Sequence, residues 1–159
     1  MKFKSTAKAF SLVELLIVLA IFSIVITIAV PAFSKYRGNA NLREVVQEIS
    51  GDIRLCKQKA VAENSRYRIQ LNVRSNNYII QKETSSSHWT NVSSLKNIGA
   101  DDAALKISGD PTYGGDRIYF QPRGTTTAGT LEIQHEKFLS KASIVTSIMG
   151  RVRIEYKFK

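Results

Sequence analysis

The sequence has little cysteine and little histidine. Its single cysteine, Cys56, excludes an intrachain disulfide, so the folded part must be stabilised by a packed core. The two histidines, His88 and His135, lack the spacing of metal ligands, and neither a P-loop nor a nucleophile elbow is present. We therefore expect neither an enzyme nor a bound cofactor.

Acidic residues are also few, 13 against 23 basic ones, which gives a formal net charge of +10. Such a balance favours acidic partners, such as nucleic acid or anionic lipid head groups. Three aspartates, Asp101, Asp102 and Asp110, lie in loop-like sequence. Calcium binding there is a minority interpretation, because the spacing of an EF-hand is absent.

The N-terminus combines a short basic leader with a long apolar run. Three lysines precede the run, which covers residues 12–30 and contains one acidic residue, Glu14. A secretory signal peptide is disfavoured, because its apolar part has about 7–15 residues and ends at a small-x-small cleavage site. A plain membrane anchor fits the length and the positive-inside rule. It leaves Glu14 unexplained, since a carboxylate inside a membrane helix costs roughly 2.5–3.5 kcal/mol.

The segment KA/FSLVELLIVLAIFSIVITIAVPAF resembles the class III signal of type IV pilins and pseudopilins. The resemblance implies that a prepilin peptidase cuts between Ala9 and Phe10 on the cytoplasmic side and methylates the Phe10 amine. The family usually has glycine before the cut, where this chain has Ala9. Glu14 and Pro31 fall at the fifth and twenty-second mature positions, where the family has glutamate and proline.

Glu14 suits assembly, because a buried carboxylate requires a cation and cleavage creates one at the Phe10 amine. In a stack of subunits, Glu14 of an incoming chain would pair with the Phe10 amine of its neighbour and set the axial register. Pro31 lacks an N–H, so we expect a kink or local melting near Ile26–Thr27. The alternative for Pro31 is simply the end of a membrane helix.

These patterns predict four segments: a cytoplasmic leader at 1–9, a transmembrane and assembly helix of the inner membrane at 10–31, an amphipathic helical half at 32–64, and a β-rich periplasmic unit at 65–159. Apolar residues recur with a period near 3.6 through the third segment. Cys56 falls on its apolar side, which favours a small buried residue over a reactive or dimer-forming thiol. Gly38 is expected at a flexible joint near the membrane surface.

From residue 66 the apolar period changes to two, which is typical of strands. We expect a hairpin of 67–73 and 78–82, a polar surface loop at 83–103, and a short strand at 105–107. Trp89 is expected to pin that loop to the core. Strands 117–121 and 130–134 are expected to pair around the loop PRGTTTAG, and strands 142–147 and 152–158 to form a final hairpin turning at Met149–Gly150.

The segments IYFQPRGTTTAGTLEI and IVTSIMGRVRIEY resemble the GspH/FimT group of minor pilins and pseudopilins. The resemblance implies an α+β, pilin-like fold in which a long N-terminal helix packs on antiparallel sheet. It also implies a subunit of a type II secretion pseudopilus or a type IV pilus, with other pilins or pseudopilins as partners.

FimT-like members of that group bind DNA for uptake, and a Gly-Arg-x-Arg segment is implicated. Here the segment supplies Gly150, Arg151 and Arg153. The two arginines share one strand face about 7 Å apart, so each can meet a phosphate of double-stranded DNA. Arg123 and Lys141, in neighbouring loops, would extend the patch. Few aromatic residues accompany the arginines, so base stacking is not indicated there.

The alternative for these arginines is a solvated strand face with Glu155 as a nearby partner. Alternating charge on an outer strand is commonplace and blunts edge pairing. In that interpretation the chain is a purely structural tip or priming subunit of a type II pseudopilus, and it binds no nucleic acid.

Overall fold

The computed structural model of the chain describes residues 11–85, 88–109 and 111–158. Ala9, Phe10 and Asp110 lie outside the described residues. Two units divide between Tyr36 and Arg37, and helix α1, Leu12–Ala62, runs through this boundary.

The N-terminal part of α1 is an apolar helix without burial. Every side chain from residue 11 to 33 is exposed, and the segment is long and apolar enough to cross a membrane. Helical structure continues through Thr27 and Pro31, so the local melting expected near Ile26–Thr27 is absent from this helix. Pro31 removes only one backbone hydrogen bond, and the Thr27 hydroxyl donates within the helix to the Ser23 carbonyl at 2.7 Å.

The part of α1 after Arg37 carries the apolar stripe of the globular unit. Side chains three and four residues apart are at most 1 % exposed: Leu42, Val46, Ile49, Ile53, Cys56 and Ala60. Cys56 is therefore a buried free thiol, as expected. Gly38 is buried too, and a Cβ there would lie 2.6 Å from the Phe138 ring. Close packing, rather than a flexible joint, accounts for this glycine.

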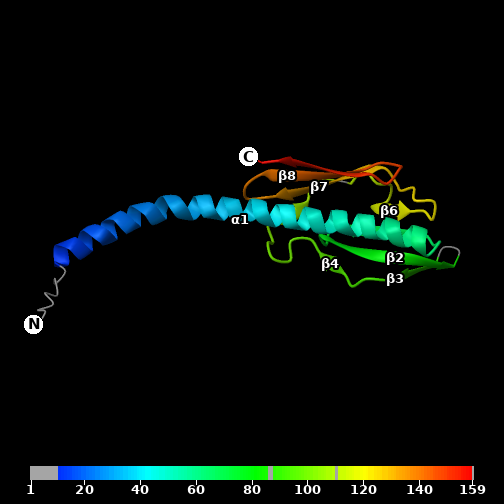
Figure 1. Ribbon diagram of the computed structural model, residues 1–159, viewed down its shortest axis with the longest axis horizontal. Coiled ribbons are helices and arrows are strands. Elements are labelled where there is room, and N and C mark those ends of the chain that lie inside the picture. Colours follow the sequence, from blue (N-terminus) through cyan, green and yellow to red (C-terminus); the bar gives the residue numbers. More distant parts are fainter. Residues whose placement is uncertain (1–10, 86–87, 110, 159) are drawn as a thin grey trace, which may run out of the picture. The chain divides into compact units, whose positions relative to one another are not determined.

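The described strands form two antiparallel sheets. Sheet A has the order β3-β2-β1-β6, with β4 also pairing β2: β1 Tyr67–Asn72, β2 Asn77–Ser85, β3 His88–Asn91, β4 Lys96–Asn97 and β6 Arg117–Phe120. Sheet B has the order β5-β7-β8-β9: β5 Leu105–Ile107, β7 Gly129–His135, β8 Ser140–Thr146 and β9 Val152–Lys157. Figure 1 shows the globular half of α1 between β2 and β4 of sheet A and β7 and β8 of sheet B, and one core joins all three layers. The expected α+β, pilin-like fold is confirmed.

Two expectations about the strands are wrong. Residues 117–121 and 130–134 do not pair, because β6 joins β1 in sheet A whereas β7 joins β5 and β8 in sheet B. The loop between them begins as a hairpin, with the bridge Phe120↔Thr126, but its ends belong to different sheets. The polar segment 83–103 is not an irregular loop either, because β3 and β4 lie in it and both pair β2.

Trp89 does not reach the core. It pairs with Glu83 across β2 and β3, and Glu83 shares its face of sheet A with Arg68 and Gln81. The opposite face of β1 carries the buried residues Tyr67, Ile69 and Leu71. Trp89 therefore stands on the outer face of sheet A.

Candidate functional site

The Gly150 turn joins β8 to β9 at the position expected from the sequence. Gly150 has a φ of +69°, a left-handed conformation that glycine adopts without a steric penalty. The Gly150 N–H donates to the Ser147 carbonyl at 2.8 Å, and the Arg151 N–H donates to the Ser147 hydroxyl at 3.2 Å. These bonds fix the turn and place Arg151 directly before β9.

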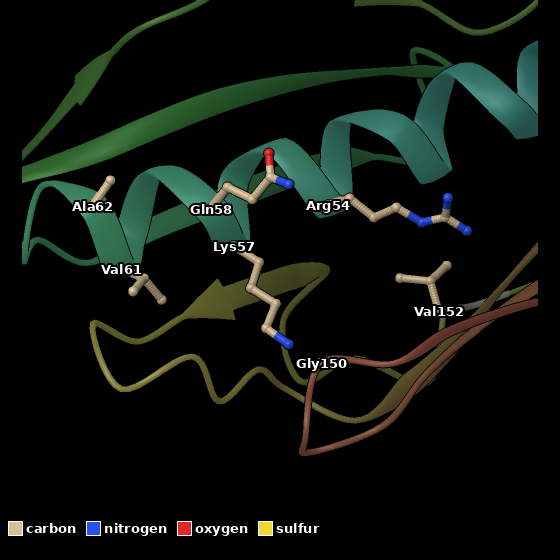
Figure 2. Close-up of a pocket in the computed structure, with 7 residues that line it drawn as sticks. All are labelled: Arg54, Lys57, Gln58, Val61, Ala62, Gly150 and Val152. Carbon is tan, nitrogen blue, oxygen red and sulfur yellow. The ribbon is translucent and has the colours of Figure 1, made fainter.

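A cavity of about 570 Å³ opens beside this turn, against the last turns of α1 (Figure 2). Arg54 and Lys57 line it from α1, opposite Gly150 and Val152. Figure 2 shows Lys57 reaching from the helix toward Gly150, and its Nζ donates to the Met149 carbonyl at 3.0 Å. Within the described residues no acidic side chain lines this cavity. The helix thus contributes the positive charge of this cavity, beside the turn.

Arg151 and Arg153 flank Val152, which lines the cavity, but side chains alternate along a strand, so the Arg153 side chain lies on the outer face of sheet B and not in the cavity. Arg153 lies in β9 opposite Val145, and its side chain is 78 % exposed. Glu155 lies 3.9 Å from the Arg153 guanidinium, and both groups are exposed. An ion pair of this length in solvent contributes little, so the Arg153 guanidinium remains exposed to solvent.

The Arg123 loop meets the Gly150 turn at Lys57. A Cβ on Gly124, the neighbour of Arg123, would lie 3.7 Å from Lys57 Cε. A Cβ on Gly150 would lie 2.8 Å from the same atom. The backbone of the Arg123 loop and the Gly150 turn therefore lie against the same lysine side chain, and the part of Arg123 in binding stays a prediction.

Lys141 does not extend this cluster. It lies in β8 and not in a loop, opposite Lys157 at the far end of the hairpin from Gly150. Lys157 and Arg153 are four residues apart along β9, about 13 Å at the rise of a strand. Lys141 shares the outer face of sheet B with Arg153 but is remote from the turn.

The sequence pattern did not single out Arg54 and Lys57. Both stand on the polar side of an amphipathic helix, where solvated charges are ordinary. Their spacing of three residues puts them on one helix face, and this was the only available signal. Arg54 and Lys57 line one cavity with Gly150 and Val152 only because β9 and its turn pack beside α1.

Asp102, considered above as a calcium ligand, instead forms hydrogen bonds with other residues of the globular unit. Its carboxylate accepts hydrogen bonds from the Asn41 amide at 3.1 Å and the Ala104 N–H at 3.1 Å, and it lies 3.1 Å from His135 Nε2. Burial raises the pKa of Asp102, but these hydrogen bonds and His135 outweigh it and hold the pKa below its usual value. Among the described residues, no group of three or more His, Cys, Asp or Glu is arranged to hold a metal ion.

Two family models match the chain. The model described as "Prokaryotic N-terminal methylation motif" matches residues 4–30. The model described as "Type II transport protein GspH" matches residues 45–150, which covers more than half of the chain and ends at Gly150. The chain belongs to the GspH family. It is thus a pilin-like protein of the GspH/FimT group of minor pilins and pseudopilins, as the sequence resemblance implied.

Solved structures share the fold of this GspH-family chain. The minor pseudopilin EpsH from the type 2 secretion system of Vibrio cholerae has a TM-score of 0.61 at 13 % identity, covering 73 % of this chain and 97 % of that one. The type IV minor pilin FimU of Pseudomonas aeruginosa PAO1 has a TM-score of 0.59 at 18 % identity, covering 76 % and 92 %. No curated protein matches the chain. At these identities the likeness concerns the fold alone.

Proposed function

We propose that this chain is a minor pilin or pseudopilin that enters a type IV filament, either a pilus or a type II secretion pseudopilus, through its N-terminal helix. One observation carries the proposal. The helix exposes every side chain from residue 11 to 33, and the methylation motif matched at residues 4–30 overlaps this segment. An apolar surface of this kind requires a membrane or other helices around it. The chain is then a structural subunit and not an enzyme.

Processing supplies the cation that Glu14 needs. A prepilin peptidase cleaves between Ala9 and Phe10 and methylates the Phe10 amine, and Glu14 of the next subunit pairs with that amine. Before assembly the helix spans the inner membrane with its N-terminus in the cytoplasm and the globular unit in the periplasm. Pro31 leaves one carbonyl of the helix without a backbone donor, which makes this region the easiest to loosen during assembly.

The globular unit binds the phosphates of double-stranded DNA at the Gly150 turn. Four cations support this assignment: Arg54 and Lys57 line the cavity, and Arg151 and Arg153 precede and follow Val152, which also lines it. Contacts of arginine and lysine with phosphates carry no base specificity and release counterions, so binding is steeply salt-dependent.

The test measures binding of a labelled duplex of about 30 base pairs by the full chain in neutral detergent, over a range of salt concentrations. Arg151→Gln combined with Arg153→Gln should weaken binding and lower the slope of log K against log salt by about 2. Lys141→Gln combined with Lys157→Gln is the matched control, because it removes two charges from the far end of the same hairpin. Equal losses in both variants, or no duplex binding at all, would leave a purely structural tip or priming subunit.

A further inference from the structure

The outer face of sheet A gathers two aromatic rings and three arginines. Strand register places Arg68 of β1 opposite Tyr119 of β6, and Trp89 of β3 opposite Glu83 of β2. The set is named here the Trp89 surface: Arg66, Arg68, Trp89, Arg117 and Tyr119. It belongs to sheet A, whereas the Gly150 turn belongs to sheet B, so the two surfaces are separate.

Within the Trp89 surface the rings and guanidinium groups are layered. The Trp89 and Tyr119 rings meet edge to face, with centroids 5.8 Å apart at 63°. The Arg68 guanidinium carbon lies 4.2 Å from the centroid of the Trp89 ring, and that of Arg66 lies 5.9 Å from both rings. Cation–π contacts of this kind hold planar groups in place at a surface. The layer is therefore preorganised for another flat group.

The positive charge of this surface is only partly neutralised. Arg66 pairs with Glu83 at 3.2 Å. Arg68 and Arg117 instead donate from Nε to the neutral amides of Gln81 and Gln70, each at 2.6 Å. In the described part of the chain, neither of these two arginines forms an ion pair with a carboxylate. Two guanidinium charges thus remain uncompensated beside the rings.

The pKa of Tyr119 indicates the same excess of positive charge at this surface. Partial burial raises the pKa of its phenol, but the neighbouring Arg117 and Arg68 outweigh this and hold the pKa below its usual value. The position that favours a phenolate favours any other anion between the same two guanidinium groups.

An open hollow of about 560 Å³ continues from the edge of this surface. Arg66 and Glu83 line its beginning, and the remainder is neutral: Asn64, Ser65, Thr84, Ser85 and Pro122. A chain that lies across sheet A can continue into this hollow without meeting a further acidic side chain among its lining residues.

We infer that the Trp89 surface binds single-stranded nucleic acid. A base stacks on the layer of Arg68, Trp89 and Tyr119, and phosphates lie near Arg68 and Arg117. Proteins that bind single strands combine positive charge with aromatic platforms, and outer faces of antiparallel sheets serve this purpose. An acidic protein segment would engage the arginines but would have no need of the flat layer.

The single tryptophan of the chain makes this surface directly observable. The full chain in neutral detergent is titrated with oligo-dT of about 20 nucleotides, and Trp89 emission is followed. Stacking should quench the emission, while inorganic polyphosphate of equal charge should leave it nearly unchanged. An equal response to polyphosphate, or binding of oligo-dT without a change in emission, would overturn the inference.

Substitutions locate the contact. Trp89→Leu should weaken binding of labelled oligo-dT roughly tenfold, while Trp89→Phe keeps an aromatic face and should retain most of the affinity. Tyr156→Leu is the matched control, because Tyr156 lies in β9 of the other sheet, is 36 % exposed and stacks on Phe158. Circular dichroism verifies that each variant is folded. Undiminished binding by folded Trp89→Leu, or an equal loss in Tyr156→Leu, would overturn the proposal.

Two further experiments distinguish binding at the Trp89 surface from duplex binding at the Gly150 turn and from binding of acidic proteins. The variant with Arg151→Gln and Arg153→Gln should still show quenching of Trp89 by oligo-dT, because its changes lie on sheet B. A failure of the duplex proposal is thereby distinguishable from a failure of this one. Poly-glutamate should displace oligo-dT poorly; displacement as effective as that by unlabelled oligo-dT would indicate a surface for acidic proteins and contradict the inference.

Discussion

Replacement of Gly150 by alanine separates the structural role of the glycine from the role of the arginines beside it. Gly150 has a φ of +69°, and a Cβ there would lie 2.7 Å from Lys57 Nζ and 2.8 Å from Lys57 Cδ and Cε. Lys57 would have to move, and its hydrogen bond to the Met149 carbonyl would be lost. The turn is thus constrained by its backbone and by its neighbour.

The cost has two parts. An L-residue in the left-handed region costs about 1–2 kcal/mol, and the loss of the hydrogen bond of Lys57 costs about 0.5–1.5 kcal/mol. Gly150→Ala should therefore lower the free energy of unfolding by about 1.5–3.5 kcal/mol. Gly109→Ala measures the cost of the left-handed backbone alone, because Gly109 has a φ of +71° and open space around its Cβ position.

The assay is urea unfolding of the full chain in detergent, followed by the fluorescence of Trp89, which lies in the globular unit. Gly150→Ala should cost more than Gly109→Ala. In a Lys57→Ala background, the cost of Gly150→Ala should fall to that of Gly109→Ala. Equal costs in the native background, or no relief in the Lys57→Ala background, would refute the reasoning about this contact.

Three other predictions concern the globular unit. Gly38→Ala should destabilise it by about 1–3 kcal/mol in thermal unfolding, because the new methyl group overlaps the Phe138 ring, and Phe138→Leu should recover part of the loss. The pKa of Asp102 is lowered in the folded protein. Its carboxylate therefore stabilises the fold fully at pH values above the unfolded-state pKa of about 3.9, and this stabilisation is lost as the pH falls through the folded-state pKa. The wild type and Asp102→Asn should therefore differ in unfolding free energy at neutral pH and converge in acid; a constant difference would contradict this. Burial, with the charge of Asp52, raises the pKa of Cys56 to about 12, so a thiol reagent should label Cys56 only as fast as the protein unfolds, and rapid labelling of the native protein would be inconsistent with the structure.

Local periodicity was sufficient to predict the helix and several strands. The stripe that includes Leu42 and Ile53 repeats at intervals of three and four residues, and the final hairpin has a glycine at its turn. Both signals lie within a short stretch of chain and do not depend on distant partners. The α+β, pilin-like fold followed from them together with the family resemblance.

Strand partners were harder to predict, because they depend on distant residues. Strands β6 and β7 are neighbours in the chain but enter different sheets. The edge strands β3 and β4 are short and polar, so their sequence resembles a loop. The position of Trp89 on the outer face could not be predicted either, since alternation in such a short polar strand does not show which face is buried.

The two proposed surfaces were predictable to different degrees. Arg151 and Arg153 stand in a short motif, and their place at a turn could be inferred locally. Arg54 and Lys57 join them only through packing of helix against turn. The Trp89 surface draws its members from three strands and from Arg66 just before β1, and no local sequence pattern gathers them.

Glu14 provides the most direct test of assembly through the N-terminal helix. Glu14→Leu is expressed in the native host, and the amount of the chain in sheared filaments is measured relative to the membrane fraction, with mass spectrometry of the mature N-terminus. Ser23→Leu, another replacement of a polar residue in the same helix, is the matched control and should assemble normally. We expect the Glu14→Leu chain to be cleaved before Phe10, to reside in the membrane and to be absent from filaments. Incorporation at the wild-type level would contradict the pairing of Glu14 with the Phe10 amine.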